Sequence, residues 1–315
     1  METGIIILFY KYVPIDFPQQ LQGWQKTVCQ QLGLRGRIIL ATEGINGTLG
    51  GSPDAIEQYI SIMRQNNLFA DIDFKTSVGG ADNFPRLQVS IKPEITALGI
   101  DPATLPASKA AEALTPHEVD TLLQNKPDNL VILDTRNRYE SRIGTFVDAI
   151  TPPIQYFKEL PAYIDNNEQL FAGKQVLMFC TGGVRCERAS AYLQEKGIAE
   201  KVWHIRGGIH RYVEEFPQGF FKGSNYVFDS RVAVTVSQDI IDHCDQCGIA
   251  SNQTTNCNNA VCNKQYLSCN ACRAATDLCC SRECQELVKT GKVPKRPYQK
   301  EVTYSHCELA HENNG

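Results

Sequence analysis

Cys180 is the residue of this sequence best placed to do chemistry. It follows the hydrophobic run 175–179, and two glycines, an arginine and a helical pattern come after it. In such a loop the backbone amides and the helix N-terminus point at the sulfur, which favours the thiolate and lowers the cysteine pKa. A lone cysteine is more often a buried hydrophobe, but this combination favours a reactive one. The predicted anion-cradling loop is Thr181, Gly182, Gly183 and Val184, with Arg185 as donor of a charge-assisted hydrogen bond to a bound anion or persulfide.

Cys186 is a second cysteine in the same stretch. It is a candidate resolving thiol, which would attack a sulfenate or persulfide on Cys180. The alternative is that Cys186 is the first helical residue and packs inward. A cysteine six residues further on can point away from the first, so the packing interpretation is slightly favoured.

The C-terminal third carries a set of cysteines with the spacing of metal ligands. Two Cys-x-x-Cys knuckles are a strong signal for tetrahedral thiolate zinc. A cross-braced pairing is predicted, with Cys244, Cys247, Cys269 and Cys272 on one ion and Cys257, Cys262, Cys280 and Cys284 on the other. His243 could substitute for a ligand, and Cys29, Cys307 and either Cys279 or Cys280 are left over. A disulfide scaffold and an iron–sulfur site are the alternatives, the first disfavoured in a reducing compartment.

Helices and strands must position these residues, and the chain divides into segments whose patterns predict such elements. Residues 1–100 show a strand, helix, strand, helix and two further strands, which predicts a ferredoxin-like or acylphosphatase-like α+β sandwich. The glycine-rich stretch 43–51 lacks a P-loop ending and is predicted to be a tight strand-to-helix turn. Ser52 is the expected N-cap of the helix that follows.

After a linker at 101–114, residues 115–222 alternate strands with helices. Thr115 is the expected cap of the first helix, with Pro116 at its first position. This alternation predicts a parallel α/β sheet, whose functional residues lie at the carboxyl ends of its strands. Residues 240–288 form the Cys-rich segment, which is poor in aliphatic residues, and 289–315 form a basic polar tail that is expected to be flexible.

The composition of the chain limits the number of domains and the classes of protein to which it could belong. The chain has 315 residues and a formal net charge of −4, which suits two or three domains and argues against an all-round nucleic-acid coat. It shows no signal sequence, no membrane span and no flavin or nicotinamide motif. We therefore expect a soluble cytoplasmic protein without a membrane partner.

Residues 115–220 resemble a rhodanese domain. Leu133-Asp134-Thr135-Arg136 with Glu140 is similar to the strand-end Asp-x-Arg pattern of that family, and 180–185 is similar to its active-site loop. Four residues separate Cys180 from Arg185, a spacing that resembles sulfurtransferases rather than the related phosphatases. The longer string 180–189, together with 41–48 and the Cys-rich segment, is similar to the rhodanese-domain tRNA uridine-34 hydroxylases, over about residues 4 to 285.

The resemblance implies an enzyme that converts wobble uridine of tRNA to 5-hydroxyuridine with molecular oxygen as co-substrate. Cys180 would be the essential nucleophile or persulfide carrier. Glu43 is then a weak candidate base, and Asn46 a candidate contact to tRNA or to the Cys180 site. Further candidate RNA contacts are Arg188, Arg206, Lys292, Lys295 and Arg296. The alternatives are a rhodanese-type sulfurtransferase and a non-enzymatic RNA-binding zinc protein, and the sequence does not fix the oligomeric state.

Overall fold

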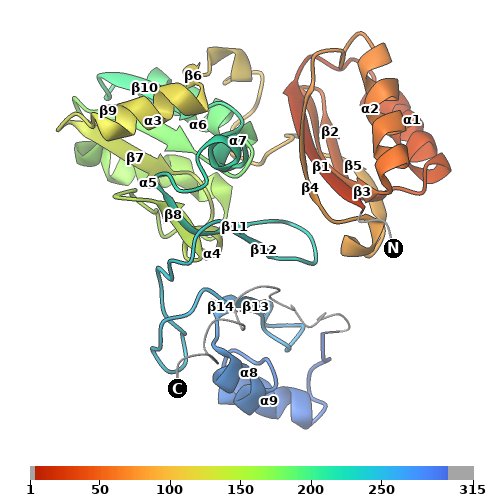
Figure 1. Ribbon diagram of the computed structural model, residues 1–315, viewed down its shortest axis with the longest axis vertical. Helices are drawn as coiled ribbons and strands as arrows, with labels where there is room; N and C mark the ends of the chain where they lie inside the picture. Colours follow the sequence, from red (N-terminus) through yellow and green to blue (C-terminus); the bar gives the residue numbers. More distant parts are fainter. Residues whose placement is uncertain (1–3, 297–315) are drawn as a thin grey trace, which may run out of the picture.

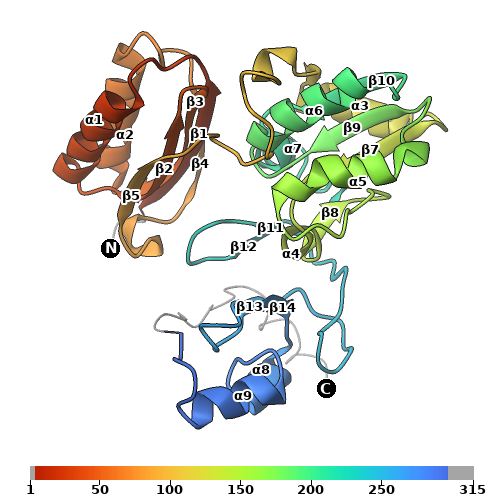
Figure 2. The ribbon, with the colours of Figure 1, turned by 180° about the vertical axis from the view of Figure 1, so that it is seen from behind.

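The computed structural model describes residues 4–296 and arranges them in three parts (Figure 1). An N-terminal α/β part and a central α/β part lie side by side, and the Cys-rich part lies below both of them in that view. The same arrangement is seen from behind in Figure 2. No helix in residues 4–296 is long and apolar enough to cross a membrane.

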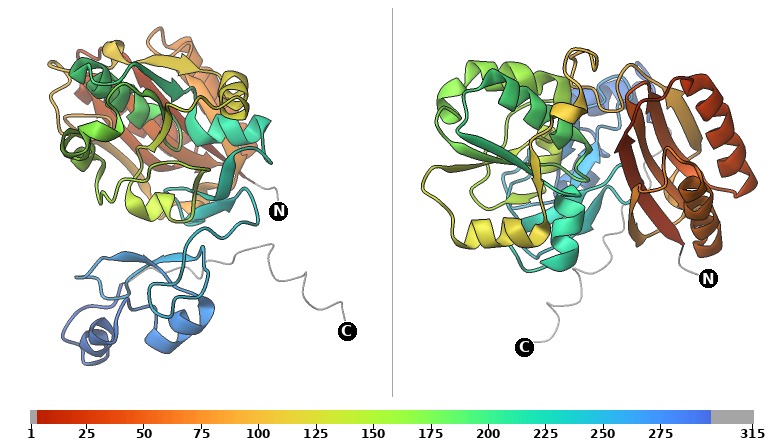
Figure 3. Two further views of the ribbon diagram at one scale, coloured as in Figure 1. Left: turned by 90° about the vertical axis from the view of Figure 1, so that its left-hand side faces the viewer. Right: turned by 90° about the horizontal axis from the view of Figure 1, so that it is seen from above.

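The N-terminal part is a five-stranded sheet with two helices on one face, as the predicted acylphosphatase-like sandwich requires. The strand order is β4-β1-β3-β2-β5, and only β2 and β5 run parallel. Ile7 and Phe9 pack under the helices, whereas the other face of the sheet turns towards the central part (Figure 3). The elements are β1 Ile5–Tyr12, α1 Pro18–Gln31, β2 Arg35–Ala41, β3 Gly44–Gly51, α2 Pro53–Gln65, β4 Asp73–Val78 and β5 Leu87–Ile91.

The glycine-rich stretch 43–51 is not a strand-to-helix turn, so that prediction is wrong. Residues Gly44–Gly51 form β3, which lies in the middle of the sheet between β1 and β2. Its glycines allow close packing, because a Cβ on Gly47 would lie 2.5 Å from the ring of Phe9. Ser52 does cap α2, since its hydroxyl accepts the backbone N–H of Ala55.

The central part is built on a parallel sheet of order β6-β10-β9-β7. Core residues place α3 and α7 on one face and α5 and α6 on the other. The predicted cap of α3 forms, with Thr115 and Glu118 completing a capping box. The predicted linker 101–114 contains β6, which pairs with β10 as an edge strand of this sheet. The elements are β6 Glu112–Leu114, α3 Pro116–Gln124, β7 Leu130–Asp134, α4 Arg138–Ser141, α5 Leu160–Asn166, β9 Gln175–Phe179, α6 Val184–Lys196, β10 Lys201–Ile205 and α7 Gly208–Glu215.

A small antiparallel sheet and the Cys-rich part complete the described chain. The small sheet has the order β12-β11-β8, with β8 Gly144–Phe146, β11 Phe221–Tyr226 and β12 Ala233–Thr235. The Cys-rich part holds a two-stranded sheet and two short helices, which are β13 Thr254–Asn256, β14 Gln265–Leu267, α8 Asn270–Thr276 and α9 Arg282–Lys289. Its local core contains Cys257, Tyr266 and Cys279, which is too little apolar material to hold it together by burial alone.

Candidate active site and metal centres

Cys180 lies directly after β9, where the chain leaves the sheet and turns into α6. The turn passes through Gly183, whose φ of 103° lies in the region that favours glycine. The backbone N–H of Gly183 donates to the Sγ of Cys180 over 3.1 Å. The sulfur therefore sits at the N-terminal end of α6, in the field of unpaired amides that the sequence predicts.

The surroundings of Cys180 favour its thiolate. Burial by itself raises the pKa of Cys180, but a hydrogen bond from Cys186, the charge of Arg185 and the backbone amides of Arg185 and Gly183 outweigh it. The pKa of Cys180 is therefore well below its usual range, and the sulfur is an anion at neutral pH. The side chain is nevertheless fully buried.

Arg185 is fixed by a carboxylate rather than left free for an anion. Its guanidinium makes a bidentate pair with Glu140, at 2.7 and 2.8 Å, and its Nη2 lies 3.4 Å from the hydroxyl of Thr181. Both members of the pair are buried. Glu140 thus holds the positive charge in place beside the sulfur of Cys180.

Cys186 points towards Cys180, not away from it. The two thiols share a hydrogen bond, and the Sγ of Cys186 lies 3.5 Å from the hydroxyl of Thr135. Burial and the neighbouring Cys180 anion raise the pKa of Cys186 well above its ordinary value, so it stays a neutral donor. Cys186 does pack inward, since it is fully buried in the core of the central part. The reason given for that packing, that its side chain points away from Cys180, is wrong, because α6 begins at Val184 and its first turn brings Cys186 back to the loop.

The open face of the N-terminal sheet covers this loop, which the sequence did not indicate. The phenol of Tyr12 donates to the carbonyl of Val184 over 3.0 Å. Leu8 lies against Gly182 and Tyr10 against Gly183, where an added Cβ would come within 2.7 Å of either side chain.

Glu187, in the first turn of α6, is a further ionisable group of the site that the sequence analysis missed. Burial raises its pKa to about 7, and its carboxyl shares a hydrogen bond with Tyr10. The charge of Cys180 also acts on this carboxyl and raises its pKa.

Arg188 cannot contact RNA in this conformation, contrary to the prediction. Its side chain is fully buried and pairs with Glu43 at 2.7 Å, and it also donates to the carbonyl of Ile100 over 2.6 Å. Glu43 is occupied by the same ion pair and by the backbone N–H of Ile95, so it is not placed as a free base. Asn46 donates to the carbonyl of Ile95 over 3.0 Å.

The remaining candidate RNA contacts are spread over two parts of the molecule. Arg206 is exposed at the end of β10 and donates to the carbonyl of Ala113. Lys292 and Lys295 are exposed after α9, whereas Arg296 is half-buried and donates to the carbonyl of Cys257. Residues 297–315 of the predicted tail lie outside the described residues.

The eight predicted metal ligands come together in two groups of four. One holds Cys244, Cys247, Cys269 and Cys272 and the other Cys257, Cys262, Cys280 and Cys284, with all sulfurs of a group within 4.8 Å of one another. Three of the sulfur–sulfur distances are 3.7, 3.7 and 3.8 Å. A tetrahedron with Zn–S bonds of about 2.3 Å has edges of about 3.8 Å, so each group fits one zinc ion.

The other cysteines among the described residues belong to neither group. Cys279 is buried in the local core beside the ligand Cys280, and Cys29 is buried under the N-terminal sheet. His243 is exposed and belongs to neither group. Cys307 lies outside the described residues.

Three family models match the chain in order. They are a UPF0176 acylphosphatase like domain at residues 4–95, a rhodanese-like domain at 115–215 and a rhodanase C-terminal domain at 222–285. The last of these starts within β11 and spans both cysteine groups.

Several relatives that match over most of their own length carry the same name. A protein of Corynebacterium jeikeium called tRNA uridine(34) hydroxylase is 38% identical over 90% of this chain and 94% of its own. A protein of the same name from Cytophaga hutchinsonii is 36% identical over 95% of this chain and 93% of its own. Among solved structures, a rhodanese-like domain from Anabaena covers 35% of this chain and 78% of its own, with 21% identity and a TM-score of 0.30.

Proposed function

The chain belongs to the tRNA uridine(34) hydroxylase family, and we propose that it hydroxylates the wobble uridine of tRNA to 5-hydroxyuridine with Cys180 as its reactive group. The observation that carries the role of Cys180 is its place at the end of β9, where the amide of Gly183 donates to its sulfur and the charge of Arg185 lowers its pKa. Molecular oxygen is the proposed co-substrate.

The thiolate suits an addition to the pyrimidine ring. The sulfur of Cys180 would bond to C6 of the uridine, and the electron pair of the C5–C6 double bond would move through C4 onto O4. The enolate formed in this way makes C5 nucleophilic, so C5 would attack molecular oxygen and form a C5–O bond. Two electrons from a thiol reductant would break the O–O bond and release the second oxygen atom as water, and loss of the C5 proton and of the Cys180 thiolate would restore the C5–C6 double bond. Arg185 and the amides of the loop Thr181–Val184 would stabilise the negative charge that develops during this addition. The same sulfur could instead carry a persulfide, and Cys186 is the proposed resolving thiol.

The other parts of the chain have proposed supporting roles. Zinc in the two cysteine groups would hold the Cys-rich part folded, because that part buries little apolar surface of its own. Arg206, Lys292, Lys295 and Arg296 are the proposed contacts to the phosphates of tRNA. The cytoplasm, where tRNA is found, is the proposed location.

Nucleoside mass spectrometry of tRNA tests this function. A strain that lacks the gene should lose 5-hydroxyuridine, and wild type should restore it. Cys180→Ala should not restore it, whereas Cys29→Ala should, because Cys29 lies under the N-terminal sheet and away from the loop.

Two outcomes would count against the proposal in different ways. If Cys180→Ala restores the nucleoside, the cysteine is not required. If wild type restores nothing under aerobic growth, the tRNA assignment falls, and a thiosulfate sulfurtransferase assay of the purified protein becomes the next measurement.

A further inference from the structure

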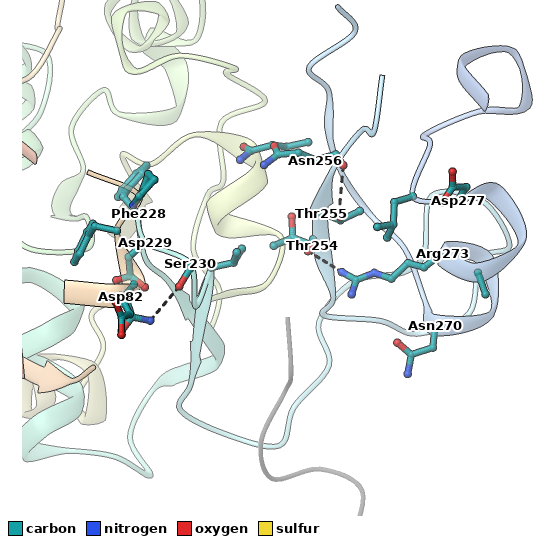
Figure 4. A pocket seen from close by; sticks show the side chains of 17 residues that line it. Asp82, Phe228, Asp229, Ser230, Thr254, Thr255, Asn256, Asn270, Arg273 and Asp277 are labelled. Carbon is teal, nitrogen blue, oxygen red and sulfur yellow. Dashed lines mark hydrogen bonds between the residues drawn. The ribbon is translucent and has the colours of Figure 1, made fainter. Parts of the chain in front are cut away.

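A cavity of about 670 Å³ lies where the three parts of the molecule meet (Figure 4). The loop 82–85 of the N-terminal part and the hairpin loop 228–232 between β11 and β12 form one side of it. Residues 254–278 of the Cys-rich part form the other side. The volume falls in the range of small-ligand sites.

The charged residues that line this cavity are three carboxylates, of Asp82, Asp229 and Asp277, and one guanidinium, of Arg273, and this excess of negative charge disfavours a phosphate as the occupant. Asp229 pairs with Arg231 at 2.6 Å, and Asp277 lies 3.5 Å from Lys295. Asp82 lies 3.7 Å from Arg35. The remaining wall is largely apolar, and the amides and hydroxyls of Asn83, Ser230, Thr255, Asn256 and Asn270 are set into it. Such a wall suits a neutral ring with hydrogen-bonding edges.

Phe228 supplies an aromatic surface at the mouth of the cavity. Its side chain is 54% exposed, although it packs on Tyr226 with ring centroids 5.2 Å apart and an interplanar angle of 72°. Aromatic rings of this kind are the usual platforms on which single-stranded nucleic acids stack their bases. In Figure 4, Phe228 and Ser230 lie on one side of the cavity and Asn270 and Arg273 on the other.

A row of aromatic rings connects this cavity to the cysteine loop. Tyr226 packs on Tyr139 of α4 with centroids 5.1 Å apart, so only Tyr226 stands between Phe228 and Tyr139. The neighbour of Tyr139 in the chain is Glu140, which binds Arg185. The cavity and the reactive sulfur are therefore joined through residues in direct contact.

We propose that this cavity binds one base of the anticodon loop that flanks the wobble uridine, stacked on Phe228. The inference rests on the proposed function, because it is the tRNA substrate that supplies the base. Proteins recognise bases of RNA loops that are splayed out of the stack. The polar groups in the cavity wall would then contact the edges of such a base. The base bound in the cavity would fix the position of the anticodon loop on the protein, and with it the position at which uridine 34 reaches Cys180.

The test measures binding of an anticodon stem-loop RNA that carries uridine at positions 33 and 34. A fluorescent label on its stem reports the dissociation constant by anisotropy. Phe228→Ala should weaken binding about 5- to 150-fold, which is the effect expected for one lost base–aromatic stack. Phe228→Trp should bind nearly as wild type does. Phe17→Ala is the matched control, since that ring is 64% exposed on the N-terminal part.

Abasic RNAs identify the base and can overturn the proposal. Removal of the base at position 33 or 35, whichever enters the cavity, should weaken binding to wild type but add nothing to the loss caused by Phe228→Ala. If Phe228→Ala binds intact RNA as tightly as wild type does, the cavity is not a base site, whether or not the protein hydroxylates tRNA. If the binding pattern holds but wild type forms no 5-hydroxyuridine, the proposed reaction fails and the base site stands.

Discussion

The chemistry of Cys180 depends on a small number of contacts around one atom. The sulfur is buried, and burial alone would keep it a neutral thiol. The amide of Gly183, the thiol of Cys186 and the charge of Arg185 reverse this preference. Glu140 takes part indirectly, because it orients the guanidinium of Arg185 through two hydrogen bonds.

Loss of the charge of Arg185 should raise the pKa of Cys180. In wild type the thiolate should persist through neutral pH and disappear only in acid, because the folded-state pKa is lowered. In Arg185→Leu the anion loses an opposite charge, so it should form only at higher pH. The measurement is the ultraviolet absorbance of the thiolate during a pH titration, taken as the difference between each protein and its Cys180→Ser counterpart, which cancels the cysteines outside the loop.

Two variants control this titration. Arg185→Lys retains the positive charge and should shift the pKa less than Arg185→Leu does. Arg206→Leu removes an exposed arginine from the end of β10 and should leave the titration unchanged. An unchanged Cys180 titration in Arg185→Leu would mean that the loop amides and Cys186 suffice to hold the thiolate.

At the scale of single residues, the sequence predicts the contacts between residues that are close together in the chain. It misses the contacts between residues that are far apart in the chain. The run of strand, cysteine, glycines and helix start places Cys180 in an amide cradle, and it does so in the structure. Glu187 has its pKa raised by burial under the N-terminal sheet, and Arg188 is held by Glu43. Neither environment is visible in the sequence, because the partners come from residues more than a hundred positions away.

At the scale of elements, strand β3 shows why a local pattern can mislead. Its glycines have low strand propensity, so 43–51 looks like a turn. In the fold, a Cβ on Gly47 would collide with Phe9 and one on Gly50 with the carbonyl of Gly80. The glycines are present because neighbouring groups approach closely, and that requirement comes from the tertiary structure.

The metal ligands of the Cys-rich part, unlike the glycines of β3, can be predicted from the sequence. Their signal is the spacing between cysteines that are close together in the chain. The two ligand sets alternate along the chain, so the loop that one ion closes contains ligands of the other ion. The residues between them contribute little core. We therefore expect the fold of residues 244–284 to depend on both metal ions.

Metal content distinguishes two adjacent cysteines. Purified wild type should contain two zinc ions per chain by elemental analysis, and Cys280→Ser should contain about one, since a thiolate ligand is lost. Cys279→Ser is the matched control, because Cys279 is buried next to Cys280 but lies outside the ligand set. It should retain both ions. Equal metal content in the two variants would contradict the assignment of Cys280 as a ligand.

Chelation gives an independent check on the same element. Strong chelators should unfold the Cys-rich part and expose its cysteines to thiol reagents, since the binding energy of structural zinc is part of the folding energy. The circular dichroism of the parallel sheet should change little, because its core of aliphatic and aromatic side chains contains no predicted ligand.

On the scale of the whole molecule, the site is assembled from separate parts of the chain. The N-terminal sheet places Tyr12 on the carbonyl of Val184, and Glu43 reaches Arg188 in α6. The hairpin of β11 and β12 meets the N-terminal part where Asn83 donates to Ser230 over 3.1 Å. Leu8 and Tyr10 of the N-terminal sheet lie against Gly182 and Gly183, so the N-terminal part covers the loop that carries Cys180.

The ion pair between Glu43 and Arg188 should be the strongest single link between the N-terminal and central parts. Both side chains are buried, so Glu43→Gln leaves a buried guanidinium with the more distant Glu94 as its remaining carboxylate, at 3.5 Å. Breaking a buried pair in this way costs about 3 kcal/mol or more. Urea unfolding should show a loss of that order.

Hydrogen exchange should show where that loss falls. Amides of α6 and of the Cys180 loop should exchange faster in Glu43→Gln, because the N-terminal part separates from them more often. Glu57→Gln is the control, since Glu57 is exposed on α2 in the same part of the chain. If Glu43→Gln lowers stability but leaves exchange at the loop unchanged, the pair only stabilises the N-terminal part, and another contact sets access to Cys180.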